Sequence, residues 1–156
     1  MLKFTPQKKF MLCAIREAKL SHKRGDYPIG ACIVKNGKII ASSGNRGKTK
    51  DDSTRHPELE LIQYVVGMYS GPYLEDCILY TTHEPCPMCS GAAVWSKIGG
   101  IVFGNSISDF KPYTNIKNKF KWRIINIPSK TITKGTDIRI FGPYMKPECS
   151  KLFNLK

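Results

Sequence analysis

The sequence lacks any long run of apolar residues. No segment reaches the roughly 20 apolar residues that a membrane-spanning helix requires, and the opening stretch, MLKFTPQKKF, carries basic residues where a signal peptide would be apolar. Internal repeats and low-complexity linkers are missing as well. These absences argue against a membrane protein and predict one cytoplasmic domain over residues 1–156, long enough to bury a sizeable core.

Acidic residues are scarce. The chain has 12 Asp and Glu against 25 Lys and Arg, which gives a formal net charge of +13. The imbalance is greatest at positions 111–156, which hold eleven Lys and Arg but only Asp137 and Glu148. Within this part, the run KNKFKWR at 117–123 interrupts the bases with aromatic residues. Such a distribution favours an anionic partner, above all nucleic acid, and a lysine-rich solvated surface is the alternative.

The six cysteines fall into two groups. Without a signal peptide, a reduced compartment fits them better than a set of disulfides. Cys86 and Cys89 have the spacing of metal ligands or of a redox pair. The other four lie in apolar runs or in the last predicted helix and are expected to be core residues: Cys13, Cys32, Cys77 and Cys149.

The apolar periodicity predicts an α/β fold. A strand–helix–strand–helix–strand order implies parallel strands joined by crossovers, and Asn36-Gly37 between the first two strands is a strong hairpin signal. In the second helix, Leu59, Ile62, Val65 and Val66 are expected to form the buried stripe. The expected elements are a helix over 6–20, strands over 29–35 and 38–44, a helix from 57 to about 67, a strand over 77–82, a helix over 88–97, strands over 99–104, 122–127 and 137–141, and a helix over 144–153.

At two predicted helix starts, proline follows a candidate metal ligand. Pro57 follows His56 and Pro87 follows Cys86, and proline suits the first position of a helix because its missing N–H has no partner there. Cys86 and Cys89 are one helical turn apart, so both sulfurs lie at a helix N-terminus, where the partial positive charge stabilises thiolates. Two thiolates and the His56 imidazole suit tetrahedral zinc, with the fourth position left for water.

Other interpretations of these residues remain open at this point. His83 could close a structural Cys2His2 site, and Cys86 with Cys89 could be a thioredoxin-like redox pair, which would leave His56 and Glu58 without a role. Glu58 could be an ordinary first-turn acid favoured by the helix dipole. Beside zinc, however, its carboxylate can take a proton from bound water and return it to a leaving nitrogen.

The patterns His56-Pro57-Glu58 and Pro85-Cys86-Pro87-Met88-Cys89 together match the signature of zinc nucleobase deaminases. With YPIGACIVKNGKII, the Asn45 loop, DSTRHPE and DCILYTTHEPCPMCSGAAVWSKIGGIVFG, the sequence resembles the cytidine deaminase-like superfamily, in particular its guanine deaminases and bacterial tRNA adenosine deaminases. The resemblance implies a three-layer α/β/α sandwich with a mixed five-stranded sheet, one zinc ion per subunit and usually a homodimer. It implies that His56, Cys86 and Cys89 hold the zinc and that Glu58 shuttles protons while ammonia is released.

The same resemblance points to residues that bind the substrate. Asn45 matches a position that hydrogen-bonds the purine or its sugar, although asparagine in a polar loop is also a common turn former. Trp95 corresponds to a pocket aromatic of guanine deaminases, with a core tryptophan as the alternative. Ile29 stands where many relatives have phenylalanine in the pocket wall, and Pro57 lacks an N–H that several families direct at the base. Asp109 is also assigned to substrate binding, although the stretch around it departs from the bacterial tRNA enzymes.

These features lead to three functional hypotheses. The first is a zinc-dependent hydrolytic deaminase that converts adenosine to inosine in tRNA, favoured by the basic C-terminal third. The second is deamination of a free base or nucleoside of the guanine or cytosine type. The third is a non-catalytic zinc module that binds RNA as a partner subunit, against which Glu58 argues because such a module would not need the acid.

Overall fold

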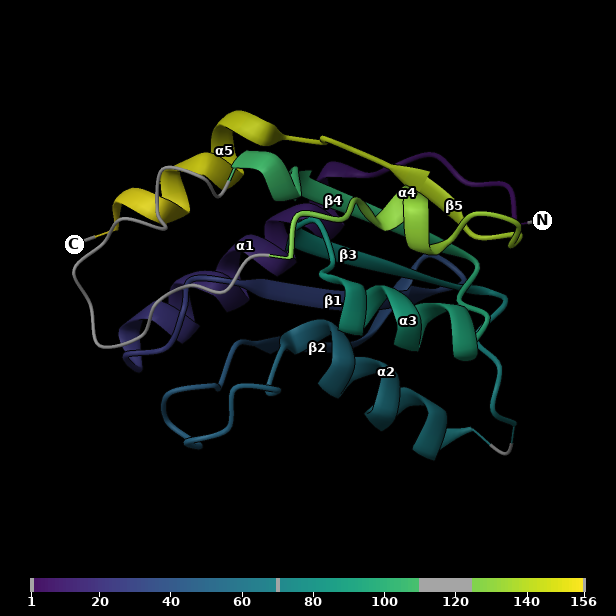
Figure 1. The fold of residues 1–156 in the computed structure, drawn as a ribbon, viewed down its shortest axis with the longest axis horizontal. Coiled ribbons are helices and arrows are strands. Elements are labelled where there is room, and N and C mark those ends of the chain that lie inside the picture. Colours follow the sequence, from purple (N-terminus) through teal and green to yellow (C-terminus); the bar gives the residue numbers. More distant parts are fainter. Residues whose placement is uncertain (1, 70, 110–124, 156) are drawn as a thin grey trace.

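The computed structural model describes residues 2–69, 71–109 and 125–155, and Figure 1 shows how its elements are arranged. The basic run at 117–123 lies outside the described residues, as do residues 122–124 of one predicted strand. In chain order the elements are α1 (Lys8–Lys23), β1 (Gly30–Lys35), β2 (Lys38–Gly44), α2 (Pro57–Met68), β3 (Cys77–His83), α3 (Pro87–Trp95), β4 (Gly100–Asn105), α4 (Ser129–Ile132), β5 (Arg139–Phe141), α5 (Lys146–Ser150) and the 3-10 helix η2 (Lys151–Asn154).

The five strands form one mixed sheet in the order β2-β1-β3-β4-β5. β1 and β2 pair antiparallel across a turn in which Asn36 and Gly37 have φ angles of 50° and 72°, the left-handed values that a tight hairpin needs. β1 also pairs antiparallel with β3, whereas β3 with β4 and β4 with β5 are parallel. α3 makes the crossover between β3 and β4 that a parallel pair requires. The predicted hairpin and mixed five-stranded sheet are confirmed.

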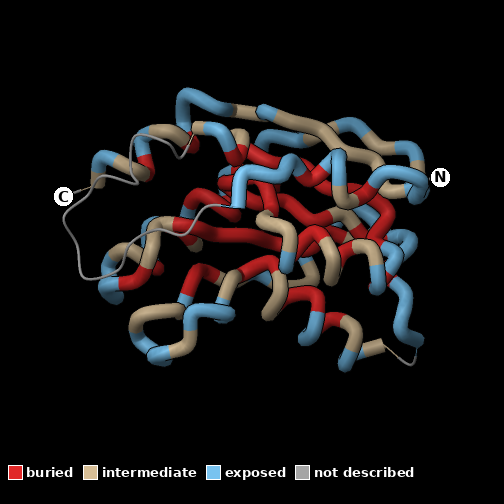
Figure 2. The backbone as a smooth tube through the Cα atoms, viewed as in Figure 1, coloured by how far each residue is buried: buried red, intermediate tan, exposed pale blue. Residues whose placement is uncertain are grey.

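Helices cover both faces of the sheet, and each face has its own core. On one face, α1 and α5 pack on a cluster that includes Cys32, Tyr80 and Val102. On the other face, α2 and α3 pack on a cluster that includes Ala31 and Leu79. Figure 2 shows the resulting buried layer along the strands, with exposed chain on the outer sides of the helices. Because side chains alternate along each strand, one sheet serves both cores and the fold has the expected three layers.

The four cysteines predicted for the core are buried in it. Cys32, Cys77 and Cys149 are fully enclosed, and Cys13 is 7% exposed. All six cysteines are free thiols. Among the described residues, no helix is both long enough and apolar enough to span a bilayer.

Several details differ from the sequence prediction. Residues 125–127, expected to end a strand, are extended but pair with no described strand. In α2, Leu61 is buried with Ile62 and Val65, whereas Leu59 and Val66, which were also predicted to be buried, are only half-buried. The buried stripe runs through positions 58, 61, 62 and 65, so the helix is turned slightly from the predicted orientation. The C-terminal helix is confirmed, but its second half tightens into the 3-10 helix η2.

Candidate metal centre and active site

The N-terminal ends of α2 and α3 meet beside the carboxyl end of β3 (Figure 1). His56 directly precedes α2, Cys86 directly precedes α3, and Cys89 lies in the first turn of α3. Nδ1 of His56 lies 3.6 Å from Sγ of Cys86 and 3.6 Å from Sγ of Cys89. All three donor atoms lie within 4.8 Å of one another, and no other residue of the described part of the chain joins the group. Three ligands predicted from separate motifs therefore converge.

This donor set fits zinc. One imidazole nitrogen and two sulfurs are preferred zinc ligands, and ligand atoms about 2.0–2.3 Å from a tetrahedral zinc would lie roughly 3.6 Å apart. The separations between His56 and the two sulfurs have this value. Three protein ligands leave a fourth position for water, which is the arrangement of catalytic rather than structural zinc sites.

The two thiols differ in acidity in the metal-free protein. Hydrogen bonds from Cys89 and from His56 lower the pKa of the Cys86 thiol to about 4. The pKa of Cys89 is raised, because Cys86 carries the negative charge of the pair and because Cys89 is fully buried. Burial alone would lower the pKa of His56, but the Cys86 thiolate and the Glu58 carboxylate raise it overall. The lowered pKa of Cys86 favours the thiolate form, which is the form that binds metal.

Glu58 is held against the ligand group. The residue is 3% exposed, and one carboxylate oxygen, Oε1, accepts a hydrogen bond of 2.5 Å from the Thr81 hydroxyl. The other oxygen, Oε2, lies 3.8 Å from Sγ of Cys89. Burial raises the pKa of Glu58, although the neighbouring His56 and the Thr81 hydrogen bond oppose the shift. Glu58 is therefore more than a solvated first-turn acid, because it is buried beside the three ligands.

His83 lies outside the metal group. Its buried ring has Nδ1 3.0 Å from the Thr82 hydroxyl and packs edge-on against Phe153, with ring centroids 4.5 Å apart. Burial lowers the pKa of His83 to about 3, so the imidazole is neutral at physiological pH. The structure gives no support to a closed Cys2His2 site that would use this histidine.

The loop after β2 holds Asn45 near the start of α2. Asn45 is buried, and its Oδ1 accepts a hydrogen bond of 2.9 Å from the backbone N–H of Gly47. The loop is fixed by Asp26, whose buried carboxylate accepts the backbone N–H groups of Lys48 (3.0 Å) and Thr49 (2.9 Å). No local sequence pattern predicts this role of Asp26, because the loop that it reaches is more than 20 residues away.

The other residues predicted to bind substrate lie in different surroundings. Ile29 and Pro57 are buried, and the backbone carbonyl of Ile29 accepts the N–H of Asn45. Asp109 accepts the backbone N–H of Ser106 at 2.8 Å and forms an ion pair of 2.9 Å with Lys146. The substrate roles of these residues remain predictions.

Trp95 is on the surface. Its side chain ends α3 and is 86% exposed, so the alternative of a core tryptophan is wrong. It lies seven residues beyond Met88, at the opposite end of α3 from the ligands. A substrate role for Trp95 in the pocket of its own subunit gains no support from this position.

A second buried carboxylate, that of Glu84, fixes the short segment between β3 and α3 that carries Cys86. Glu84, two residues before Cys86, accepts the backbone N–H of Ile107 (2.9 Å) and both the N–H and the hydroxyl of Ser129 (2.8 Å each). It thereby ties the end of β3 to the segment after β4 and to the start of α4. No local sequence pattern predicts this contact either, since its partners lie 23 and 45 residues away.

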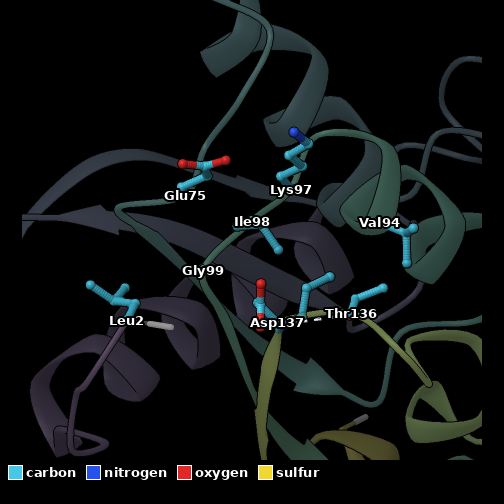
Figure 3. Close-up of a pocket in the computed structure, with 9 residues that line it drawn as sticks. Leu2, Glu75, Val94, Lys97, Ile98, Gly99, Thr136 and Asp137 are labelled. Atoms are coloured by element: carbon cyan, nitrogen blue, oxygen red, sulfur yellow. Dashed lines mark hydrogen bonds between the residues drawn. The ribbon is translucent and has the colours of Figure 1, made fainter.

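A hollow elsewhere on the described surface is distinct from this site. It has a volume of about 400 Å³ and lies at the far end of α3, between Val94, Lys97, Ile98, Glu75 and Asp137 (Figure 3). None of the residues predicted for the active site lines it. The chemistry of the donor atoms, rather than the shape of the surface, identifies the candidate centre.

Known proteins are similar to this chain in sequence and in fold. Residues 5–105 match the family described as the cytidine and deoxycytidylate deaminase zinc-binding region. The chain is 42% identical over 100 residues to the tRNA-specific adenosine deaminase of Bacillus subtilis (strain 168), an alignment that covers 64% of this chain and 62% of that protein. It is 35% identical over 147 residues to the tRNA-specific adenosine deaminase of Buchnera aphidicola subsp. Baizongia pistaciae, covering 94% of this chain and 85% of that protein.

A solved structure gives the same result. The structure of guanine deaminase from Bacillus subtilis matches with a TM-score of 0.65 and 32% sequence identity, covering 79% of this chain and 84% of that one. The family match extends over more than half of the chain and includes His56, Cys86 and Cys89. The protein therefore belongs to the cytidine and deoxycytidylate deaminase family of zinc-binding enzymes.

Proposed function

We propose that this protein is a zinc-dependent hydrolytic deaminase that converts adenosine to inosine in tRNA, consuming water and releasing ammonia. The observation that carries the proposal is the buried Glu58 carboxylate beside three converging ligands, His56, Cys86 and Cys89. These are the residues that would hold the zinc ion. A bound zinc would act as a Lewis acid and lower the pKa of water to about 7.

Glu58 would move the protons of the reaction. Its Oε2 is on the side of Cys89, so it is placed to take one proton from the attacking water and deliver it to the ring nitrogen. It would then take the second proton, from the hydroxyl group added to the base carbon, and deliver it to the amine, which leaves as ammonia while the carbonyl forms. Thr81 occupies Oε1 and fixes the carboxylate in this orientation. The pKa of Glu58, raised by burial, suits a group that must both accept and return a proton near neutral pH.

Asn45, Pro57 and Ile29 are proposed to contact the base or its sugar. Asn45 and Ile29 are linked by a backbone hydrogen bond of 2.9 Å, so the two positions are fixed relative to each other. Pro57 has no N–H to offer, and a base that needs this donor would lose roughly 1 kcal/mol, or more if its acceptor were left buried and unpaired. The base would therefore be oriented mainly by the other contacts, including Asp109 if the RNA reaches it.

Relatives and charge support tRNA as the substrate. Two of the similar proteins described above are named tRNA-specific adenosine deaminases. This chain spans only 62% of the length of the first of them, so the activity of the whole relative is carried over as a proposal. The net charge of +13 suits a polyanionic substrate. Free guanine is the second candidate, supported by the structural match to guanine deaminase.

An ammonia-release screen tests the substrate. Purified, zinc-loaded protein should release ammonia from unmodified tRNA that carries the target adenosine, and tRNA binding should weaken steeply as salt is raised. Free guanine, cytosine and adenosine serve as parallel substrates in the same assay. Turnover of free guanine without any tRNA affinity would reject the tRNA assignment and favour the second candidate.

We propose further that two copies form a homodimer through α3, each with one zinc ion, in the reducing cytoplasm that thiolate ligands favour. Met88, Gly91, Ala92 and Trp95 recur at helical spacing, and the two large side chains are 38% and 86% exposed. A stripe of large and small apolar residues suits close helix contact with a second copy.

Replacing Trp95 with glutamate is therefore expected to convert the dimer to a monomer. Sedimentation velocity at micromolar concentration measures the change. Leu20→Glu is the matched control, because Leu20 is also exposed (44%) but lies on α1, which covers the other face of the sheet. A wild-type protein that sediments as a monomer would contradict the dimer.

A further inference from the structure

A groove lies between the edge strand β2, the helix α2 and the loop that joins them. Its volume of about 610 Å³ is in the range of ligand-binding sites. Figure 1 shows this loop projecting beyond the start of α2. Two lining residues are chain neighbours of candidate site residues: Arg55 precedes His56, and Arg46 follows Asn45. The groove therefore lies beside the start of α2, where the candidate metal centre is.

The groove carries unbalanced positive charge. Arg55 is shared between two acids, Asp52 (3.0 Å) and Glu60 (3.4 Å), of which Glu60 lines the groove, so Arg55 is not available to a ligand. Arg46 and Lys50 also line it and are exposed, and neither has an ion-pair partner among the described residues. Two cations are therefore available to an anionic ligand.

Arg46 and Lys50 lie on a turn that backbone hydrogen bonds hold in place. The N–H of Lys50 donates to the carbonyl of Arg46 (3.0 Å), which is a helical i to i+4 turn and places both side chains on one side. The N–H of Arg46 donates to the carbonyl of Arg55 (3.1 Å) and closes the base of the loop. Between the cations, the buried Asp26 carboxylate accepts the N–H groups of residues 48 and 49. A ligand would not have to order this loop, which favours binding.

An exposed aromatic ring completes the groove. Tyr64 of α2 lines its wall and is 59% exposed. Exposed aromatic rings beside cations are the usual means of holding single-stranded nucleic acid, since bases stack on the ring while the cations hold the phosphates.

We propose that this groove binds the single-stranded RNA next to the base held at the metal centre, with phosphates at Arg46 and Lys50 and a neighbouring base on Tyr64. The inference rests on the proposed function, because it assigns a place to the flank of the same substrate. A peptide strand pairing with the free edge of β2 would be the other occupant. Because Arg46 and Lys50 are available as cations, we favour the polyanionic RNA over the peptide strand.

Binding of a labelled RNA stem-loop with a single-stranded, adenosine-containing loop tests the proposal. Fluorescence anisotropy over a series of salt concentrations measures affinity and its salt dependence, with zinc-loaded full-length protein. The double variant Arg46→Gln, Lys50→Gln should bind about tenfold more weakly at low salt. The slope of log K against log salt should fall by about 1.4, because each single-strand phosphate contact contributes about 0.7. Tyr64→Ala should weaken binding by about fivefold or more and leave the slope unchanged.

The matched controls remove positive charges and an aromatic ring from parts of the surface outside the groove. Lys19→Gln with Lys23→Gln removes two exposed charges from α1, which covers the other face of the sheet. Tyr73→Ala removes an exposed aromatic ring that does not line the groove. Both controls should bind RNA like the wild type.

Three results would overturn the inference, and they separate it from the proposed function. Wild-type affinity and slope in the Arg46, Lys50 double variant, with RNA still deaminated, would reject the groove and leave the function standing. A wild-type protein that neither binds nor deaminates RNA would reject both. If the double variant changed the sedimentation of the RNA-free protein and not its RNA affinity, the groove would be a protein contact instead.

Discussion

Replacing Glu58 with glutamine is expected to abolish ammonia release while zinc stays bound. The amide keeps the size of the side chain and an acceptor for the Thr81 hydroxyl, but it can no longer take up a proton. Loss of a positioned general acid–base lowers the turnover number by roughly 10²–10⁴-fold. Ammonia release and zinc content, measured on the same preparation, check this result.

The control for this experiment is Glu75→Gln. Glu75 is an exposed acid at the far end of α3, so its loss changes the net charge by the same amount without touching the centre. Glu75→Gln should keep full activity. An active Glu58→Gln variant would remove Glu58 from the mechanism and would revive the interpretation of a zinc module that binds RNA without catalysis.

Cys86 should be alkylated faster than Cys77 and Cys149 in the zinc-free protein. At pH 7 it is fully ionised, whereas burial raises the pKa values of Cys77 and Cys149 to about 12. The lower intrinsic nucleophilicity of an acidic thiolate offsets part of this difference, so we expect a ratio of roughly 30-fold at pH 7. Iodoacetamide labelling with peptide mass spectrometry measures the individual rates.

The alkylation rate of Cys86 should depend on pH differently from those of Cys77 and Cys149. A thiol with a pKa of about 4 stays ionised as the pH falls from 8 to 5, so the rate at Cys86 should remain nearly constant over this range. The rates at Cys77 and Cys149 should drop about tenfold per pH unit, because their thiolate fractions do. Added zinc should protect Cys86 and leave the other two unchanged. Labelling of Cys86 that is slow, or that zinc fails to prevent, would contradict its assignment as a ligand.

Local signals in the sequence were enough to predict the ligand group and most of the sheet. Asn36-Gly37 specifies a hairpin by backbone preference alone, and proline after His56 and after Cys86 fixes the helix starts that carry the ligands. Each signal acts within a few residues of the chain. The convergence of the two helix starts then follows from the crossover that parallel strands require.

Local sequence patterns could not predict the contacts between distant parts of the chain. Asp26 and Glu84 act on backbone groups more than 20 residues away, and nothing in their own neighbourhoods marks them. Trp95 had an apolar context that suited either a pocket or a core, yet the end of α3 faces outward. Residues 125–127 have strand-like composition, yet they pair with no described strand.

The Glu84 carboxylate couples the candidate metal centre to two distant parts of the chain. It accepts the N–H of Ile107 with one oxygen and the N–H and hydroxyl of Ser129 with the other, and it lies two residues before Cys86. The position of Cys86 therefore depends on residues 23 and 45 positions beyond Glu84, as well as on the helix that Cys86 precedes.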